Sequence, residues 1–295
     1  MLVTVLGAGA GGGLPQWNCG CRNCADARDG RLPRMTQSSV AVSVNGRDWA
    51  VLNASPDIRD QLDRTDTLHP PGLRGSPIRA VILTNADVDH VAGLLTLREK
   101  TGFDIFASAD ILSVLAANPV FGVLDPTLVS RRPIALERPF SPIEGLQITP
   151  FAVPGKVALY LEGENVETDA MGEQTVGLCL MAGGKRAYYV PGCATAPDWL
   201  VTKIADADLL MFDGTVWDND EMATTGTGTK TGARMGHIAM AGPEGSLARL
   251  AGVKGRKVFV HINNTNPALQ PDGPEALAVA QAGWTIAQDG MELQL

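Results

Sequence analysis

Short apolar runs alternate with helical patterns and turn residues along the whole chain. The apolar, often β-branched runs predict strands at residues 2–6, 78–83, 104–107, 146–151, 208–212 and 257–260. Helical patterns predict helices at 92–99, 109–117, 197–205, 244–252 and 274–281, and two short strands are expected at the end. Since no linker interrupts this order, we expect one α/β domain over residues 1–295.

Turn residues add further elements. Two pairs of apolar runs separated by turn signals predict β-hairpins, 40–44 with 49–52 around Asn45-Gly46 and 177–181 with 187–190 around Gly183-Gly184. Ser55 and Pro56 predict the N-cap and first residue of a helix. Residues 162–175 are acidic and favour a mobile loop. The loop 216–236 is long enough to be functional or disordered.

Composition excludes several classes of protein. Hydrophobic residues make up 45% and charged residues 19% of the 295 residues, as is ordinary for a globular protein. The net charge of −8 and the lack of a basic run argue against nucleic-acid binding. No apolar stretch approaches the about 18 residues that a membrane span needs. The amino terminus has no basic region or clear cleavage site, so we expect a soluble, cytoplasmic protein.

A glycine-rich stretch follows the first predicted strand. Gly7, Gly9 and Gly12 match the dinucleotide-binding pattern G-x-G-x-x-G. That pattern has to open a helix, whereas Leu14-Pro15 and the residues after it favour a loop. The better interpretation is a flexible loop that lets the backbone pass close to another group, and we expect no nucleotide cofactor.

Three of the five cysteines stand close together. Cys19, Cys21 and Cys24 form a C-x-C-x-x-C cluster, and three thiols in a reduced compartment are typical ligands of one soft metal ion. Zinc in tetrahedral coordination is the first choice. Reactive redox cysteines, or three structural thiols without metal, are the alternatives. Three thiolates leave little room for catalysis, so we expect a structural zinc whose fourth ligand comes from elsewhere.

Two carboxylates and an imidazole follow the predicted strand 78–83. Asp87, Asp89 and His90 stand in a tight turn at the carboxyl end of that strand, where α/β folds favour binding sites. Such a combination is typical of metal ligands. The alternative is a solvated acidic turn whose aspartates cap the next helix. The turn alone leaves both interpretations open.

Further polar residues follow later strands. Asp213 and His261 each come after a predicted strand, and His237 follows the long loop 216–236. The chain has only four histidines, and the fourth, His69, lies between turn residues and is expected to be an exposed loop histidine.

Several of these motifs are diagnostic together. They are the cysteine cluster, the turn 85–90, Val153-Pro154-Gly155-Lys156, Met211-Phe212-Asp213-Gly214-Thr215 and His261-Ile262-Asn263-Asn264-Thr265-Asn266-Pro267. The chain resembles, over essentially its full length, the branch of the metallo-β-lactamase superfamily that takes part in the biosynthesis of pyrroloquinoline quinone (PQQ). This resemblance implies a four-layer αββα sandwich.

The chain departs from the superfamily's metal-binding motif, H-x-H-x-D-H. Asn85 and Asp87 replace the first two histidines, no histidine lies at 154–156, and Pro191 stands where a bridging aspartate is expected. His261 matches the last family histidine. A two-metal hydrolase needs ligands for both ions, so the missing ones argue against hydrolysis.

The ligands that match the superfamily are Asp89, His90 and His261. One carboxylate and two imidazoles are the composition of the facial triad of non-haem Fe(II) oxygenases, which leaves positions for dioxygen and substrate. The resemblance therefore implies an active-site iron with dioxygen as co-substrate. The alternative for His90 is a structural histidine that caps a helix.

Other residues receive roles from the same comparison. We expect Asp87 to be an extra ligand or to hydrogen-bond one, and Asp213 to orient a ligand histidine. His237 is a candidate catalytic acid or base, or a substrate-positioning residue, with a structural role as the alternative. Asn264 falls three residues after His261, where relatives have a zinc-binding histidine, and is the candidate fourth zinc ligand.

The implied function is oxidation of a PQQ precursor. The iron site fits hydroxylation of the tyrosyl ring in the peptide-derived, cross-linked glutamate–tyrosine precursor, and other pathway proteins are possible partners. A non-catalytic carrier that moves PQQ or its precursor out of the cytoplasm is the alternative, and a hydrolase with an unusual site is a third. Lys156, Arg34 or Lys230 is expected to supply the positive charge that an acidic ligand needs.

Overall fold

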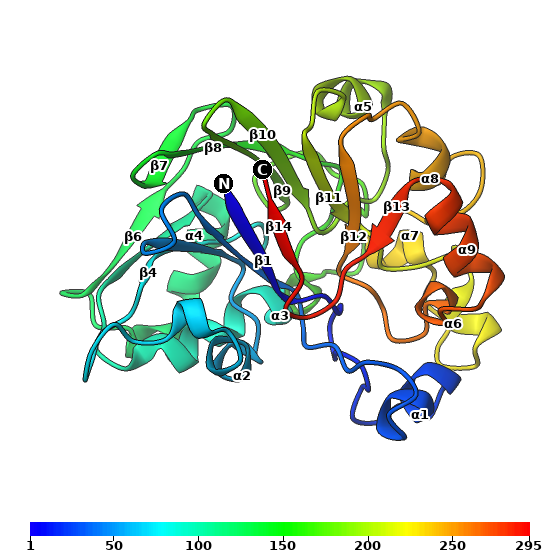
Figure 1. Ribbon diagram of the computed structural model, residues 1–295, viewed down its shortest axis with the longest axis horizontal. Coiled ribbons are helices and arrows are strands. Elements are labelled where there is room, and N and C mark those ends of the chain that lie inside the picture. The colour runs from blue at the N-terminus through cyan, green and yellow to red at the C-terminus, as the bar shows by residue number, and fades with distance from the viewer.

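The computed structural model describes residues 1–295 and contains two sheets of seven strands each. In sheet order, the first consists of β14 (Glu292–Gln294), β1 (Leu2–Gly7), β2 (Ser39–Ser43), β3 (Trp49–Leu52), β4 (Ile78–Ile82), β5 (Phe103–Ala107) and β6 (Val129–Pro133). The second consists of β13 (Trp284–Ile286), β12 (Arg256–Val260), β11 (Leu209–Asp213), β10 (Lys185–Val190), β9 (Val176–Ala182), β8 (Leu146–Ala152) and β7 (Phe140–Ile143). The sheets lie in the middle with helices outside them (Figure 1), which confirms the expected αββα sandwich.

Short helices connect the strands. The α-helices are α1 (Arg22–Arg28), α2 (Ile58–Asp63), α3 (Val88–Val91), α4 (Ala109–Ala117), α5 (Asp198–Ile204), α6 (Glu221–Thr224), α7 (Gly232–Met235), α8 (Ser246–Arg249) and α9 (Pro274–Gln281). The 3₁₀ turns are η1 (Asp66–Leu68), η2 (Ala92–Arg98), η3 (Pro119–Val123), η4 (Leu159–Leu161) and η5 (Pro267–Leu269). None of these helices combines the length and the apolar character that crossing a bilayer requires.

The core has two parts because strand side chains alternate between the two faces of a sheet. Val40 and Val42 of β2 belong to an apolar cluster of 50 buried residues that includes side chains of both sheets. Ala41, between them, belongs to a second cluster of 22 residues beneath the helices that cover the first sheet. Since both faces are covered, the strands read as continuous apolar runs.

The pairing directions bring the polar strand ends together. β1 is parallel to β3 and β4 within the first sheet, and β8, β10, β11 and β12 are parallel within the second. Each group therefore ends at one edge of its sheet. A parallel bridge between Gly9 and Ile262 joins the two edges, and α3 lies in the centre, where the two halves meet (Figure 1). The site is built at this shared edge.

Most predicted strands and both hairpins are confirmed, but several helices differ from their predictions. The helix expected from Ser55 begins at Ile58, because the Ser55 hydroxyl accepts the Asp57 N–H and forms a turn first. The helix expected at 92–99 is the 3₁₀ segment η2, which follows the short α3. The Gly93 N–H donates to the Ala54 carbonyl, which takes it out of the helical ladder.

Three further differences from the predicted elements concern a helix, the long loop and two strands. The helix expected at 244–252 is only Ser246–Arg249, since the amides of Ser246 and Leu247 bond to residues 239–240. The loop 216–236 contains α6 and α7, the latter capped by the Thr231 hydroxyl and ended by left-handed Gly236. β6 and β7 were not predicted because both contain proline, which sheets tolerate at their edges.

Candidate active site and metal centres

Asn85 orients His90 in the turn after β4. Its Oδ1 accepts the Asp87 N–H at 3.0 Å, which fixes the amide, and lies 2.7 Å from Nδ1 of His90. An amide oxygen only accepts, so Nδ1 of His90 carries the ring proton. Nε2 therefore presents a lone pair. This nitrogen is buried without a hydrogen-bond partner, 3.9 Å from Oδ2 of Asp89.

Two candidate metal ligands from distant parts of the chain, Asp89 and His261, are in direct contact. Nε2 of His261 lies 3.0 Å from Oδ2 of Asp89, although the residues are 172 positions apart. The backbone of His261 has φ of 59°, a left-handed conformation that is uncommon outside glycine. This strain, stored at the end of β12, positions the ring. One ligand atom from each of Asp89, His90 and His261 lies within 4.8 Å of the others.

Thr215 links this triad to Asp213, which in turn holds His237. Its Oγ1 lies 2.7 Å from Oδ1 of Asp213 and 2.8 Å from Nδ1 of His261. The carboxylate accepts the single hydroxyl proton, so the hydroxyl oxygen accepts from Nδ1–H of His261. This leaves Nε2 of His261 as the nitrogen that faces Asp89. Thr215 was not predicted to have a role of its own, and its place two residues after Asp213 at a strand end is the signal that was available.

Asp213 contacts a different histidine from the one expected. Oδ2 of Asp213 accepts from Nδ1 of His237 at 2.7 Å and from the Cys193 N–H at 2.9 Å. It reaches the ligand candidate His261 only through Thr215. The rings of His237 and His261 are stacked with their centroids 5.1 Å apart. The end of the long loop is therefore part of the site.

The buried charges shift one another's pKa values. Burial lowers the pKa of His90 to about 4, so this ring is neutral at neutral pH, the form that binds metal. Burial opposes ionisation of Asp89, but the two imidazoles outweigh it and lower its pKa. For His261, burial is again opposed, here by the hydrogen bond to Asp89, and the pKa is raised. Without a cation, a proton on His261 balances the Asp89 carboxylate.

Asp87 lies beside the triad and not within the group of converging ligand atoms. Its backbone carbonyl accepts the His90 N–H at 2.9 Å, but its carboxylate makes no hydrogen bond to Asp89, His90 or His261. Its Oδ1 instead accepts the Leu159 N–H at 3.4 Å. Burial, and then the charge of Asp89, raise its pKa. Its catalytic role stays a prediction.

Of the three residues expected to supply positive charge for an acidic ligand, only Lys156 lies near the site. Lys156 is largely buried near Gly236, the residue before His237, and pairs with Glu162. Arg34 and Lys230 are exposed and form no hydrogen bond or ion pair with the site. The sequence signal for Lys156 was its position just after β8, at the shared edge.

The glycine-rich loop lies against the site. Ala10 donates its N–H to the Ile262 carbonyl, and a Cβ on Gly11 would lie 3.6 Å from the carboxylate of Asp89. The next helix, α1, begins only at Arg22, so the glycines do not open a helix, which agrees with the interpretation as a close backbone approach and not as a dinucleotide motif.

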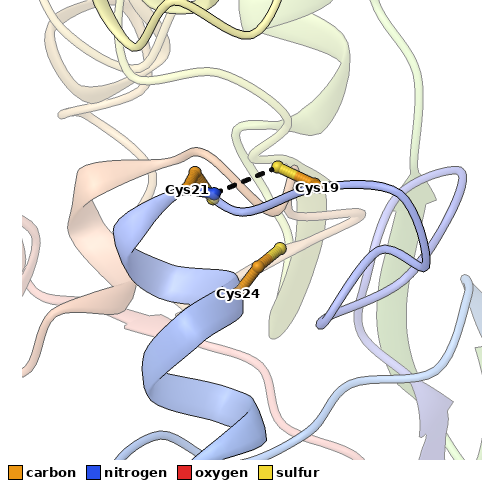
Figure 2. Close-up of side chains that lie close together, drawn as sticks. All are labelled: Cys19, Cys21 and Cys24. Atoms are coloured by element: carbon orange, nitrogen blue, oxygen red, sulfur yellow. Dashed lines mark hydrogen bonds between the residues drawn. The ribbon is translucent and has the colours of Figure 1, made fainter.

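Cys19, Cys21 and Cys24 converge around the start of α1, with their sulfur atoms within 4.8 Å of one another (Figure 2). The Cys21 N–H donates to the Cys19 sulfur at 3.4 Å, the dashed line in Figure 2. Burial raises the pKa of the Cys24 thiol to about 11, so a free thiol there stays protonated. Three sulfurs in this arrangement fit a thiolate metal site.

Asn264 lies directly over the three sulfurs. Its Nδ2 is 3.2 Å from Cys19, 3.6 Å from Cys21 and 3.3 Å from Cys24. The nitrogen faces the sulfurs as a donor, whereas a ligand would have to present the amide oxygen. The residue is thus where a fourth ligand belongs, and its role as a ligand stays a prediction.

Known proteins share this sequence pattern and this fold. A family model described as the beta-lactamase superfamily domain matches residues 48–262. Coenzyme PQQ synthesis protein B from Ruegeria pomeroyi is 57% identical over 295 residues, which cover 100% of both chains. The protein of the same name from Rhizobium meliloti is 54% identical and covers 99% of this chain and 97% of its own. The chain therefore belongs to the β-lactamase superfamily and, within it, to the coenzyme PQQ synthesis protein B family.

Solved structures agree with this assignment. The crystal structure of Zn(2+)-bound PqqB from Methylobacterium extorquens superposes with a TM-score of 0.98, at 54% identity and with 100% of both chains covered. A diphosphatase of the PhnP family shares the fold at a TM-score of 0.67 and 21% identity. Family membership places the chain in PQQ biosynthesis.

Proposed function

We propose that this protein is an Fe(II)- and dioxygen-dependent hydroxylase that acts on the tyrosyl ring of the cross-linked glutamate–tyrosine precursor of PQQ. Insertion of one oxygen atom into the ring C–H bond takes two electrons from a soluble reductant and two protons, and the second oxygen leaves as water. The product is a catechol, which a further oxidation turns into a quinone.

The observation that carries the proposal is the unpartnered Nε2 of His90. A buried imidazole lone pair next to the Asp89 carboxylate, with Nε2 of His261 on the same carboxylate, calls for a cation between them. Asn85 occupies a place where the superfamily has another histidine, and its oxygen is already used by His90. The donor set therefore fits one ion held by one carboxylate and two imidazoles.

Asp89, His90 and His261 would hold the iron, and Fe(II) bound there supplies the redox chemistry and the open positions for dioxygen and substrate. The protein's own residues prepare this site. Asn85 and Thr215 each bond to the far nitrogen of a ligand histidine, which fixes the ring and its tautomer. The loop at Gly11 leaves room beside Asp89 because it has no side chain.

His237 is our candidate for the proton transfer. Its Nδ1–H donates to the buried Asp213 carboxylate, so Nε2 carries the lone pair and is able to accept the phenol proton. The stacking of His237 on His261 keeps this base next to the ligand set. Asp213 holds the tautomer of the base, and through Thr215 it also supports the ring of the candidate ligand His261.

We also propose that Cys19, Cys21 and Cys24 hold a structural zinc. The three sulfurs converge at the start of α1, and residue 264 connects them to the loop that follows His261. Zinc at this point would tie the amino-terminal segment to β12. For the alternative of redox cysteines, burial opposes ionisation of Cys19, but hydrogen bonds from Cys21, Cys24 and Asn264 outweigh it and lower its pKa, which suits a metal-bound thiolate equally well.

The test is oxygen-dependent conversion of a defined substrate. Protein loaded anaerobically with Fe(II) is mixed with the cross-linked glutamate–tyrosine dipeptide and ascorbate, oxygen is admitted, and oxygen uptake and product mass are followed. We expect one added oxygen atom per turnover, and loss of turnover in His90→Ala and His261→Ala. His69→Ala is the matched control, because His69 is exposed and its ring contacts only the backbone carbonyl of Asp63 by a hydrogen bond.

The outcomes separate the candidate functions. Full conversion by both His90→Ala and His261→Ala would end the hydroxylase proposal. Binding of PQQ without oxygen uptake would favour the carrier. Turnover of a phosphodiester or a lactam with Zn(II) or Mn(II) would favour the hydrolase.

A further inference from the structure

One carboxylate near the site is held by two cations. Oε1 of Glu162 lies 2.8 Å from Nζ of Lys156, and Oε2 lies 2.7 Å from Nη2 of Arg234. Nη1 of Arg234 also donates to Oε1 at 3.2 Å, so the guanidinium contact is bidentate. The side chains of Lys156 and Glu162 are only 11% and 8% exposed. This is the geometry with which proteins bind a ligand carboxylate.

Both cations border the candidate active site. The Lys156 side chain packs on Gly236, where an added Cβ would lie 3.1 Å from its Cγ, and His237 follows directly. Arg234 belongs to α7, three residues before His237. Lys156 is also close enough to Asp87 to oppose the upward shift of that residue's pKa. Two positive charges are thus held at the edge of an otherwise acidic site.

The segment that carries Glu162 is weakly anchored. We call residues 157–162 the strap. The Tyr160 hydroxyl donates to the Ala86 carbonyl at 2.7 Å, and the Leu159 N–H reaches Asp87 at 3.4 Å. Leu159 and Leu161 are 57% and 44% exposed, and Ala158 is the one apolar residue of the strap that is buried in the second cluster, so the strap buries little apolar surface. Segments of this kind open at low free energy.

We propose that Lys156 and Arg234 form an anion subsite for a carboxylate of the substrate, and that Glu162 fills this subsite in the free protein and yields it when substrate binds. An acidic ligand approaches a chain of net charge −8 and needs local cations to bind. Glu162 supplies an equivalent carboxylate in the meantime, so the largely buried Lys156 is not left unpaired, and Arg234, whose side chain is 39% exposed, keeps its bidentate contact. When a substrate carboxylate replaces that of Glu162, Lys156 and Arg234 keep an anionic partner and the strap is released.

The inference rests on the proposed function only for the identity of the ligand, a polycarboxylate of the PQQ pathway. The test uses metal-free protein and PQQ itself as the probe, with the dissociation constant measured by calorimetry. Glu162→Gln removes the internal competitor and is expected to tighten PQQ binding about tenfold, whereas Arg234→Gln is expected to weaken it about tenfold. Glu164→Gln, the same change of charge two residues further along, is the matched control and is expected to leave binding within about twofold.

Two further measurements separate carboxylate recognition from a purely structural ion pair. The trimethyl ester of PQQ keeps the rings but has no carboxylates, and its affinity is expected to be equal in all four proteins. Amide hydrogen exchange in residues 157–162 of the wild-type protein is expected to accelerate when PQQ is added. If Arg234→Gln does not fold, Arg234→Lys, which keeps the charge but loses the bidentate contact, is expected to bind PQQ more weakly than wild type.

Several results would overturn the subsite. They are unchanged or weaker PQQ binding in Glu162→Gln, unchanged binding in Arg234→Gln, slower or unchanged exchange in the strap, and no PQQ binding by any form. A failure of the hydroxylase assay together with the expected PQQ pattern would leave the subsite standing and remove only the proposed reaction. Hydroxylation without the expected pattern of PQQ binding would leave the proposed reaction standing and remove only the subsite.

Discussion

His90 and Asn85 are joined by a 2.7 Å hydrogen bond from the ring Nδ1 to the amide Oδ1, and this bond decides which nitrogen of His90 is available. Asn85 occupies the first histidine place of the superfamily motif. In this chain the residue at that position orients the candidate ligand His90. The same substitution therefore removes an imidazole from the motif and fixes the tautomer of its neighbour.

Replacement of Asn85 by alanine is expected to weaken metal binding at the triad. Removal of the acceptor frees the tautomer and rotation of His90, and such supports typically contribute about 10- to 100-fold in affinity. The measurement is competition for Fe(II) or Zn(II) against a chelator of known affinity. Asn85→Asp keeps an acceptor oxygen and is expected to lose less. Equal affinity in Asn85→Ala and wild type would contradict this role.

The metal-free protein is expected to lose stability as the pH falls from about 6.5 towards 4. Burial lowers the folded-state pKa of His90 to about 4, below its ordinary value, so the unfolded chain binds more protons in this window. Stability from this group is complete above about pH 6.5, and its loss amounts to about 3 kcal/mol. Urea unfolding at neutral pH and at about pH 4.5 measures it.

His90→Gln is the control for that experiment. It removes the titrating ring while the other acidic and basic groups of the site stay in place. Its loss of stability between the two pH values is expected to be smaller than that of the wild type. A loss as large as that of the wild type would show that other groups carry the effect.

Thr215→Val is expected to destabilise the fold and to break the link between His261 and the Asp213–His237 pair. The substitution keeps the shape but leaves Nδ1 of His261 without its partner, whereas Oδ1 of Asp213 keeps the backbone N–H of residue 215. A buried unsatisfied group typically costs about 1–3 kcal/mol. Thermal unfolding measures the loss. Thr215→Ser retains the hydroxyl and is expected to stay near wild type. An undiminished melting temperature in Thr215→Val would argue against the link.

Cys24→Ser is expected to abolish the zinc of the cysteine site. Metal analysis of the purified protein should show one zinc fewer per chain than in the wild type, together with a lower melting temperature, because the metal connects the amino-terminal segment to residue 264. Cys179→Ala, a buried cysteine of β9 away from the cluster, is the matched control and should keep its zinc. Retention of all zinc by Cys24→Ser would exclude this site.

The strand order and the places of the polar residues followed from the sequence because they depend on local patterns. The turn at 85–90 and the hairpin around Gly183-Gly184 have signals within a few residues. The lengths of the helices did not follow. The amide of Gly93 bonds to Ala54, a partner 39 positions away, and no local pattern contains that contact.

The sequence by itself determined which residues are able to bind metal, since Asp89, His90 and the three clustered cysteines form their groups within one turn of chain. His261 and His237 were expected only through the family resemblance, and the tertiary structure decided how they meet Asp89 and Asp213 and that Thr215 links them. These residues follow different strands and meet because the parallel strands of both sheets end at one shared edge. The protonation of each ring was also a tertiary outcome, because burial and hydrogen-bond partners set it and the sequence does not contain them.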